Sequence, residues 1–305
     1  MNRHFLRFKD LPPAEISPLL YRAIELKNGA DSRALEGMAV ALLFEKPSLR
    51  TKLSFWIGAE KLGAKPVYFS PEEVGLGQRE PVSDVAKVIA SMANMAVVRT
   101  FAQSTLDEFG ENSDVPVINA LTDGEHPCQA LADVMTMLEI RGYLDDVRVA
   151  FIGDGNNVAA SLAYAVAGLG GDILIASPNG YELPYGLRSD VGGYTSDVAK
   201  MGSVIQMRDP VEATRNADFV YTDVWTSMGQ EAETAQRLKD FRGYQVNPEL
   251  MEYAKPQARF MHDMPAHPGE EVSEDMLSHP SSVVYQQAEN RMWAQMALME
   301  HIVRN

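Results

Sequence analysis

The sequence predicts an α/β protein with two doubly wound parallel-sheet domains joined by interdomain helices. Short apolar runs alternate with helical stretches of about 10 to 15 residues, a pattern typical of βαβ units and parallel sheets. Runs such as MAVALLFE are continuously apolar rather than alternating, as expected for strands that are buried on both faces. The pattern starts again after residue 141, and 305 residues suffice for two domains of about 150 residues each.

The first domain is expected to span residues 1–135. It begins with a helix at Pro13–Lys27, after which strands and helices alternate. The predicted strands lie at residues 38–45, 65–69, 95–101 and 115–120, and the predicted helices lie at 54–62, 82–92, 105–109 and 127–141. The helix at 127–141 opens with a proline, which suits a first helical position, and we expect it to be the hinge between the domains.

The second domain is expected to span residues 136–285. Its predicted strands lie at residues 147–155, 172–177, 203–207, 218–225 and 258–262, and its predicted helices lie at 158–169 and 211–216. We expect about four strands in each sheet. A C-terminal helix, at about 286–305, is expected to pack back toward the first domain.

Composition excludes several classes of partner. The formal net charge is −15, and an acidic surface disfavours nucleic acid and anionic membranes. The sequence has no run of 18 apolar residues, and its start lacks the apolar stretch of a signal peptide, so we expect neither a membrane span nor a secreted protein. Cys128 is the single cysteine, which rules out an intrachain disulfide and fits a reducing compartment such as the cytoplasm.

The first candidate site follows the first strand. Ligands of open α/β sheets bind beyond the carboxyl ends of strands, and here Ser48-Leu49-Arg50-Thr51 precedes a helix. Two hydroxyls and a guanidinium at a helix N-terminus favour an anion, because free N–H groups and the helix dipole also point there. An ordinary N-cap with a surface arginine explains the same residues.

Two further strand ends carry polar residues. Arg99 ends an apolar strand, where an ion pair with a nearby acid is the simpler interpretation. His126 and Gln129 are three residues apart at a helix start, so both can face one pocket, where the imidazole could donate to an oxyanion. Cys128 is expected to point elsewhere and to pack in the core.

The loop at GDGNN resembles a dinucleotide-binding loop only in part. Val158 stands where the third glycine belongs, and Ser177 ends the next strand where an acid would bind a ribose. An NAD enzyme is therefore disfavoured. We expect Asn156 and Asn157 to bind a small polar ligand instead.

Three segments in the last third of the chain contain further candidate site residues. Asp223 and Ser227 follow a strand, where a carboxylate and a hydroxyl suit a primary ammonium, or else form an ordinary turn. Arg291 lies in the last helix, where an isolated arginine is usually solvated or paired. The strand end HDMPAHPGEE could hold a His/Asp pair, but His262, His267, Glu270 and Glu271 lie across a Pro/Gly corner without the helical spacing of metal ligands, so no metal is expected.

Together these segments resemble the aspartate/ornithine carbamoyltransferase family, nearly end to end. The family motif S-T-R-T appears as Ser48–Thr51, and H-P-x-Q appears as His126–Gln129. DVWTSMG resembles the D-x-x-x-S-M-G element of the ornithine branch, HDMPAHPGEEV its H-C-L-P-A-H-x-G-E-E-V, and QAENRMW its last helix.

The resemblance implies a carbamoyl-phosphate-binding first domain and an ornithine-binding second domain. The carbamoyl phosphate residues would be Ser48, Leu49, Arg50, Thr51, Arg99, His126, Gln129 and Arg291. The ornithine residues would be Asn157, Asp223, Ser227, Met228, Asp263 and Met264. Catalysis would fall to Thr51, Arg99, His126 and Asp263, without metal or organic cofactor. The products would be L-citrulline and phosphate, in arginine synthesis or in the reverse direction.

The resemblance also implies homotrimers or multiples of trimers, in which the loop Gly75–Pro81 completes a neighbouring site. Leu49, Lys52 and Trp56 depart from the family pattern without removing phosphate binding. Asp263 replaces a cysteine beside the reacting amine, where a carboxylate would either raise the pKa of the ammonium or accept its proton. Two alternatives stay open, namely a carbamoyltransferase for lysine, putrescine or an acylated ornithine, and a non-catalytic ligand-binding relative.

Overall fold

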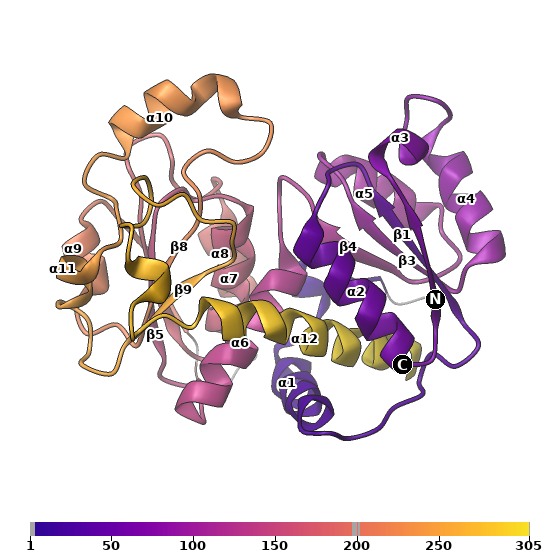
Figure 1. The fold of residues 1–305 in the computed structure, drawn as a ribbon, viewed down its shortest axis with the longest axis horizontal. Helices are drawn as coiled ribbons and strands as arrows, with labels where there is room; N and C mark the ends of the chain where they lie inside the picture. Colours follow the sequence, from indigo (N-terminus) through magenta and orange to yellow (C-terminus); the bar gives the residue numbers. More distant parts are fainter. Residues whose placement is uncertain (1–3, 197–199, 201, 305) are drawn as a thin grey trace. The chain divides into compact units, whose positions relative to one another are not determined.

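The computed structural model describes residues 4–196, 200 and 202–304. The chain divides into two compact units: unit 1 holds the residues up to Met135 and those from Glu289 onward, and unit 2 holds Thr136–Ala288 (Figure 1). The chain leaves unit 1 within α6 (Pro127–Arg141) and returns within α12 (Val284–Arg304). Among the described residues, no helix combines the length and apolarity needed to cross a membrane.

Unit 1 is built on a four-stranded parallel sheet in the order β2-β1-β3-β4. The strands are β1 (Ala39–Phe44), β2 (Lys65–Phe69), β3 (Met95–Arg99) and β4 (Val117–Leu121). The helices that accompany them are α1 (Pro13–Lys27), α2 (Leu49–Lys61), α3 (Pro71–Val74), α4 (Val82–Met92) and α5 (Gln103–Glu111), after a short 3₁₀ turn at Phe8–Asp10.

Helices cover both faces of this sheet. Successive side chains of a strand point to opposite faces, and in β1 every residue from Val40 to Phe44 is buried. One face packs Leu43 and Val98 with Ala86 of α4 and Phe109 of α5. The yellow C-terminal helix α12 of Figure 1 belongs to this unit from Glu289 onward, where Lys27 donates to Asn290 at 2.7 Å.

Unit 2 is built on a five-stranded parallel sheet in the order β7-β6-β5-β8-β9. The strands are β5 (Arg148–Ile152), β6 (Asp172–Ala176), β7 (Val204–Met207), β8 (Phe219–Thr222) and β9 (Arg259–His262). The helices are α7 (Asn157–Gly168), α8 (Leu187–Tyr194), α9 (Pro210–Thr214), α10 (Thr234–Asp240) and α11 (Pro248–Met251), with 3₁₀ turns at Glu231–Glu233 and Met276–Ser278.

The core of unit 2 also lies on both faces of its sheet. Ala150, Val220 and Phe260 form one apolar cluster, while Phe151 and Tyr221 stack at 5.4 Å between ring centroids on the other face. Alternation along β5 and β8 explains this division, because neighbouring residues of a strand face opposite ways. All of α7 after its first residue is buried, which its alanine-rich sequence allows.

The strand orders locate the candidate site. In each sheet the first strand lies in the interior. The strands that follow it in the chain are added on one side of it, and the remaining strands are added on its other side. The strand order therefore reverses between β1 and β3 in unit 1 and between β5 and β8 in unit 2. Ligands of open α/β sheets bind in the crevice outside the carboxyl ends of such strands. Ser48 and Arg99 lie there in unit 1, and Asn156 and Asp223 lie there in unit 2.

The structure confirms the predicted fold class and corrects several element bounds. Helix α2 begins at Leu49 rather than at residue 54, because Ser48 caps it. Strands β5 and β8 are shorter than predicted, since their polar ends are loops that carry site residues. The second sheet has five strands rather than about four, and the sequence interpretation missed the short helices α3, α8, α10 and α11, which are four to eight residues long.

Candidate active site

The first turn of α2 confirms Ser48 as an N-cap. Its Oγ accepts the backbone N–H of Thr51 at 3.3 Å and donates to Thr51 Oγ1 at 2.9 Å. The cap fixes the start of the helix directly beyond β1, where the remaining N–H groups of the first turn point away from the helix. Leu49 is 77% exposed, so only its backbone can take part in an anion site.

Two arginines from distant segments converge on Thr51. Arg99 Nη1 lies 3.4 Å and Arg291 Nη2 lies 2.8 Å from the Thr51 hydroxyl oxygen. Arg99 is 8% exposed and Arg291 is 3% exposed. Burying two guanidinium groups is costly, and an anion held by charge-assisted hydrogen bonds offsets that cost. The Thr51 cluster, defined as Ser48, Thr51, Arg99 and Arg291, therefore favours a small anion.

His126 and Gln129 lie at the start of α6, in the same unit. Burial lowers the pKa of His126 well below its usual value, and the positive charges of Arg291 and Arg99 lower it further. The imidazole is therefore neutral and offers one donor and one acceptor. Gln129 Nε2 donates to Asp133 at 2.8 Å, while its buried Oε1 has no hydrogen-bond partner among the described residues. That oxygen can accept an N–H from a ligand.

In unit 2, Asn156 and Asp223 are fixed at the switch point. Asn156 Oδ1 caps α7 by accepting the N–H groups of Val158 and Ala159, and its Nδ2 donates to Asp223 Oδ2 at 2.7 Å. Asp223 Oδ1 accepts the N–H of the next residue at 2.7 Å. Asn156, which the sequence predicts as a ligand-binding residue beside Asn157, is thus engaged within the protein, and its role is to orient the Asp223 carboxylate.

The segment after β8 forms a tight turn. Gln230 N–H donates to Ser227 O at 3.0 Å, and Ser227 N–H donates to the Gln230 side chain at 3.1 Å. Gly229 has a φ of 95°, a left-handed conformation that glycine adopts without steric cost. Met228 in this turn is half-exposed.

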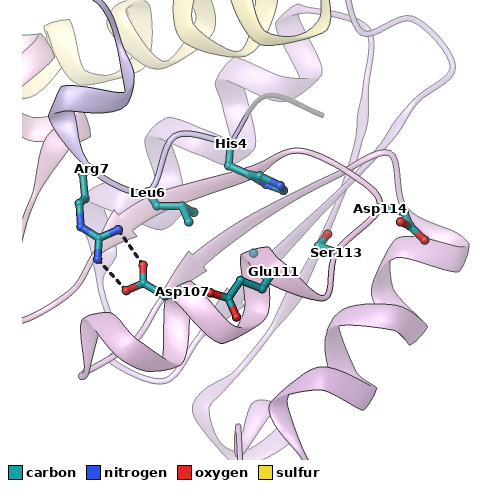
Figure 2. Close-up of a pocket in the computed structure, with 8 residues that line it drawn as sticks. His4, Leu6, Arg7, Asp107, Glu111, Ser113 and Asp114 are labelled. Atoms are coloured by element: carbon teal, nitrogen blue, oxygen red, sulfur yellow. Dashed lines mark hydrogen bonds and ion pairs between the residues drawn. The ribbon is translucent and has the colours of Figure 1, made fainter. Parts of the chain in front are cut away.

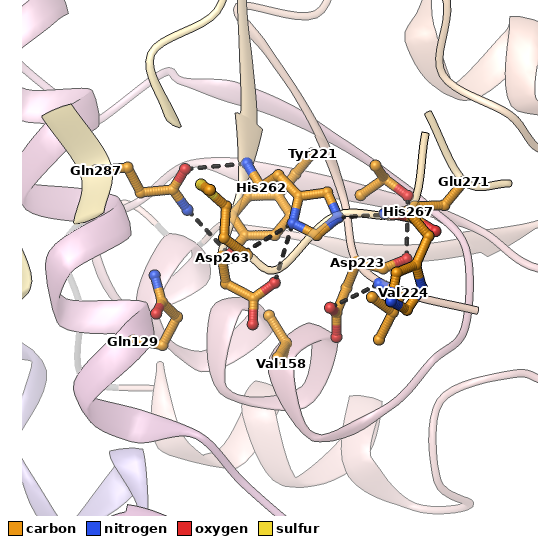
Figure 3. A network of polar contacts seen from close by, with 12 residues as sticks. Gln129, Val158, Tyr221, Asp223, Val224, His262, Asp263, His267, Glu271 and Gln287 are labelled. Carbon is orange, nitrogen blue, oxygen red and sulfur yellow. Dashed lines mark hydrogen bonds and ion pairs between the residues drawn. The ribbon is translucent and has the colours of Figure 1, made fainter. Parts of the chain in front are cut away.

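The end of β9 is organised around the buried ring of His262 (Figure 3). Its Nδ1 accepts the N–H of Met264 at 2.8 Å, so the ring carries its proton on Nε2, which lies 3.3 Å from Glu271 Oε1. Gln287 accepts the His262 backbone N–H at 3.0 Å and donates to the Tyr221 hydroxyl at 3.1 Å. These bonds fix the strand end and the tautomer of the ring.

Asp263 lies beside that ring with a side chain that is 13% exposed. Its Oδ1 is 3.5 Å from His262 Nδ1, the nitrogen that already accepts the Met264 N–H. His262 therefore donates no hydrogen bond that would stabilise Asp263 as an anion. Met264 has a φ of 61°, which is uncommon for a residue with a side chain and occurs at functional sites.

Two groups of potential metal ligands occur among the described residues of unit 2. Asp223, His262 and Asp263 form one, and His267, Glu270 and Glu271 form the other, with ligand atoms within 4.8 Å of one another. The sequence analysis weighed the residues of the second group as metal ligands, together with His262, and disfavoured them because of their spacing. Internal bonds engage both: His262 Nδ1 accepts a backbone N–H, and Glu271 Oε1 accepts the N–H of His267. In this arrangement the side chains hold the Pro/Gly corner together.

Comparisons with known proteins decide the family. The model of the aspartate/ornithine carbamoyltransferase carbamoyl-P binding domain matches residues 3–139, and that of the Asp/Orn binding domain matches 145–302. The chain belongs to the aspartate/ornithine carbamoyltransferase family. Relatives named ornithine carbamoyltransferase include one from Nitrosococcus oceani, 46% identical over 98% of this chain and 97% of that protein, and one from Bacillus subtilis, 44% identical over 99% and 94%. The solved structure of the Pyrococcus furiosus ornithine carbamoyltransferase is 41% identical, covers 98% of this chain and 96% of that chain, and has a TM-score of 0.92.

Family membership gives the observed clusters their context. In unit 1, Arg99 and Arg291 contact Thr51 of the first family motif, and in unit 2, ligand atoms of Asp223, His262 and Asp263 lie within 4.8 Å of one another. Besides Asp263, the chain departs from the family pattern at Leu49, Lys52 and Trp56, and the local structure explains each of these three. The Lys52 ammonium lies 3.5 Å from the Tyr68 ring centroid, the Trp56 indole donates to Glu60 at 3.2 Å, and Leu49 is solvent-exposed.

Cys128 packs in the core, as predicted. Its Sγ donates to the Asn119 carbonyl at 3.3 Å, and burial raises the pKa of the thiol to about 12. The positive charge of Arg291 lowers the pKa only in part. A thiol with this pKa is not a nucleophile near neutral pH.

The sequence interpretation missed several residues that support the site. Lys46 is buried beside the Ser48 cap, pairs with Asp123 and lies 4.3 Å from the Phe101 ring centroid. Glu45 accepts the Leu76 N–H at 3.1 Å. A charge at the end of an apolar strand, the signal that selected Arg99, also occurs at Glu45 and Lys46 and could have identified both.

A separate pocket of about 600 Å³ lies in unit 1, lined by residues of the N-terminal segment and α5 (Figure 2). Its arginine is neutralised, because Arg7 forms two hydrogen bonds with Asp107, at 2.6 and 2.8 Å. Glu111 and Asp114 make the remaining lining acidic. None of the predicted site residues lines this pocket, and it offers no cationic binding group for a phosphate.

Proposed function

We propose that this protein transfers the carbamoyl group of carbamoyl phosphate to the side-chain amine of L-ornithine and forms L-citrulline and phosphate. The observation that carries the proposal is the charge at the two switch points. Unit 1 presents buried guanidinium groups and a neutral imidazole, which suit an anion with a carbonyl group. Unit 2 presents carboxylates and amides, which suit an amino acid with a second ammonium.

Carbamoyl phosphate binds in unit 1 in this proposal. Its phosphate lies against Ser48, Arg50 and Thr51, with the backbone N–H groups of the first turn of α2, including that of Leu49. The carbamoyl NH₂ donates to the buried Oε1 of Gln129, which has no other partner among the described residues. Arg291 adds positive charge beside the phosphate.

Thr51, Arg99 and His126 polarise the carbonyl. Attack by the amine turns the carbonyl oxygen into an oxyanion, and hydrogen-bond donors that are already in place stabilise that charge. Neutral His126 donates one N–H and Arg99 donates from its guanidinium. The C–O bond to phosphate then breaks, the attacking nitrogen passes its remaining extra proton to the departing phosphate, and phosphate leaves into the cradle of α2. Positioning and electrostatics suffice for this step without a cofactor, because phosphate is a good leaving group.

The amino acid binds in unit 2 in this proposal. Asp223, held by Asn156, and Ser227 bind the α-ammonium, while Asn157 and the Met228 backbone bind the carboxylate side. Asp263, with the Met264 backbone beside it, takes the proton from the side-chain ammonium and so produces the nucleophilic amine. The bonds at the end of β9 hold Asp263 in place for this role, because Gln287 accepts the His262 backbone N–H and the His262 ring accepts the Met264 N–H.

We further propose that the protein acts in arginine synthesis as a cytoplasmic homotrimer or a multiple of trimers. The loop Gly75–Pro81 would complete a neighbouring site, and its exposed Gln78, Arg79 and Glu80 are available for such contacts. The single cysteine, buried and unreactive, suits the reducing cytoplasm.

A panel of amines tests the reaction. The protein is incubated with carbamoyl phosphate and L-ornithine, N-acetyl-L-ornithine, L-lysine or putrescine, and the ureido product is quantified. We expect L-ornithine to give the highest kcat/KM, because Asp223 and Ser227 recognise a free α-ammonium. Turnover of another amine but not of ornithine contradicts the proposal, and binding of carbamoyl phosphate without any turnover would identify a non-catalytic relative.

Variants of Asp263 test the proton transfer. Asp263→Asn keeps the size but removes the basic carboxylate, and we expect kcat for ornithine to fall about 10²-fold with little change in KM. Asp263→Cys restores the residue of the family motif and should retain ornithine as substrate. If Asp263→Asn instead raised kcat, the carboxylate would be retaining the proton on the ammonium rather than removing it.

A further inference from the structure

Arg237 is the one buried residue of helix α10. Its Nη1 donates to Asp154 Oδ2 at 2.6 Å and to the Trp225 carbonyl at 2.9 Å, while its Nε donates to Glu233 at 2.9 Å. The Arg237 side chain is 7% exposed and that of Asp154 is 13% exposed, whereas Glu233 is 59% exposed. The guanidinium therefore makes two bonds in the interior and one at the surface.

The bonds of Arg237 connect the two ends of the segment that runs from β8 to α10. Trp225 lies at the start of the segment that leads to α10, and Arg237 lies within that helix, so one side chain joins both ends of the segment. The turn at Ser227–Gln230 lies between them. Because the ends are fixed, the turn can vary its position only by bending within a short stretch of chain.

The same guanidinium ties the segment to the loop after β5. Asp154 lies in that loop, directly before the cap of α7, where Asn156 donates to Asp223 at 2.7 Å. Burial lowers the pKa of Arg237, but its bonds to Asp154 and Glu233 outweigh burial and raise the pKa overall. The ion pair therefore links the segment that holds the Ser227 turn with the loop after β5, in which Asn156 bonds to Asp223.

Aromatic rings shield this ion pair from water. The Tyr181 ring centroid lies 4.9 Å from the Arg237 guanidinium carbon and 4.7 Å from the Phe241 ring, and Trp225 stacks on Phe241 at 5.5 Å. Gly155 approaches the chain so closely that a Cβ there would lie 2.3 Å from the Leu183 nitrogen. A pair in such surroundings is screened little by salt and holds a fixed geometry.

We propose that the Arg237–Asp154 ion pair is a positioning device for the amino-acid substrate. It sets the position of Ser227 and Met228 relative to Asp223, so that one amino acid can reach all three. This inference rests on the proposed function of those three residues. Arg237 and Asp154 are positioning residues, because their groups bond to the protein and act on the substrate only through the turn.

Kinetics of matched variants test this role. Asp154→Asn and Arg237→Gln each break the buried pair, and Glu233→Gln removes only the exposed partner of the same guanidinium. We expect both buried variants to raise KM for ornithine about tenfold and leave KM for carbamoyl phosphate within about twofold, as coupled neighbours do. Glu233→Gln should change neither KM more than about twofold. The double variant should raise KM for ornithine by less than the product of the two single increases, because the two residues form one interaction.

A merely structural role predicts a different result. If the buried variants lowered the melting temperature but changed both KM values equally, or neither, the positioning role would be wrong. Arg237→Lys serves as a second variant, since it keeps the charge but replaces the planar fork, which bonds Asp154, Trp225 and Glu233 in fixed directions, with a single ammonium nitrogen. It should show the same selective rise in KM for ornithine, by about threefold to tenfold.

Tryptophan fluorescence separates this inference from the proposed reaction. Trp225 is one of three tryptophans, and Trp225→Phe identifies its share of the emission. Titration with L-ornithine in the absence of carbamoyl phosphate, or with L-norvaline, which lacks the reacting amine, in its presence, should change that emission. Should the wild type form no ureido product, the proposed reaction fails, yet weaker binding by Arg237→Gln in this titration still supports the positioning role. Equal binding by both proteins, or none by the wild type, overturns it.

Discussion

The candidate site residues of the two units are held in different ways. In unit 1 the side chains start from regular elements, namely the first turn of α2, the end of β3 and the helix α12, and meet at the buried Thr51 hydroxyl. In unit 2 the side chains lie in loops after β5, β8 and β9, and bonds between side chains, such as Asn156 to Asp223, fix them. The candidate residues of unit 1 are therefore fixed by regular elements of the fold, and those of unit 2 by bonds within its loops.

This difference explains where the chain departs from its family. Lys52 and Trp56 adjoin the cradle on the outside of α2, where other contacts accommodate them. Asp263 lies in a loop of unit 2, next to His262, where aspartate in place of cysteine changes the charge at the end of β9.

The largest effect is expected from Arg99→Gln. This change removes a buried guanidinium that contacts Thr51 and that we propose as a donor to the oxyanion, and removal of one such donor typically lowers kcat about 10²- to 10³-fold. Steady-state assays with ornithine measure the loss. Arg33→Gln, at an exposed position of the same unit, is the matched control and should stay within about twofold of the wild type. A similar loss in both variants would show that the effect is not local to the Thr51 cluster.

A moderate effect is expected for pH-dependent stability. The pKa of His126 is lowered by burial and then by Arg291 and Arg99, whereas the unfolded chain titrates near 6.5. Below that pH the unfolded state binds a proton that the folded state does not, so stability is complete above pH 6.5 and falls as the pH drops, by about 1.4 kcal/mol per unit. The decline ends at the folded pKa. Urea unfolding of the wild type and His126→Asn measures this difference, and parallel pH dependence in the two proteins would contradict it.

The smallest effect is expected from Cys128→Ala. The thiol is buried and its pKa is raised to about 12, so it does not act as a nucleophile or a base. We expect kcat/KM to change less than about twofold, with a stability loss of about 1 kcal/mol from the lost packing. Native protein should also resist alkylation until it is unfolded. Rapid inactivation by iodoacetamide would show that the site reaches this residue.

Sequence reasoning found the strand ends but not how they connect. Arg99 and Ser48 were identifiable because a charge after an apolar strand and a hydroxyl before a helix are local signals. The bond from Arg291 to Thr51 joins residues 240 positions apart, and only the packing of α12 brings them together. The same holds for Arg237 and Asp154, which lie 83 positions apart in segments of ordinary composition.

The loops of unit 2 also show why residue type alone does not identify the partners of a side chain. Asn156 and Asn157 are equivalent in the sequence, but capping geometry commits Asn156 to α7 and Asp223. The corner residues His267 and Glu271 cluster although their spacing predicts no metal site, because the backbone turns back on itself there. Fold class follows from periodicity, whereas the partners of a loop side chain depend on tertiary contacts.

We propose above that cations of unit 1 bind carbamoyl phosphate and that carboxylates of unit 2 bind the amino acid. Calorimetry on Arg50→Ala and Asp223→Asn tests it most directly, with carbamoyl phosphate alone and with L-norvaline at saturating carbamoyl phosphate. We expect Arg50→Ala to weaken carbamoyl phosphate about 10- to 100-fold and leave norvaline nearly unchanged, and Asp223→Asn to do the reverse. If Arg50→Ala bound carbamoyl phosphate as tightly as the wild type, or Asp223→Asn lost it, the claim would be contradicted.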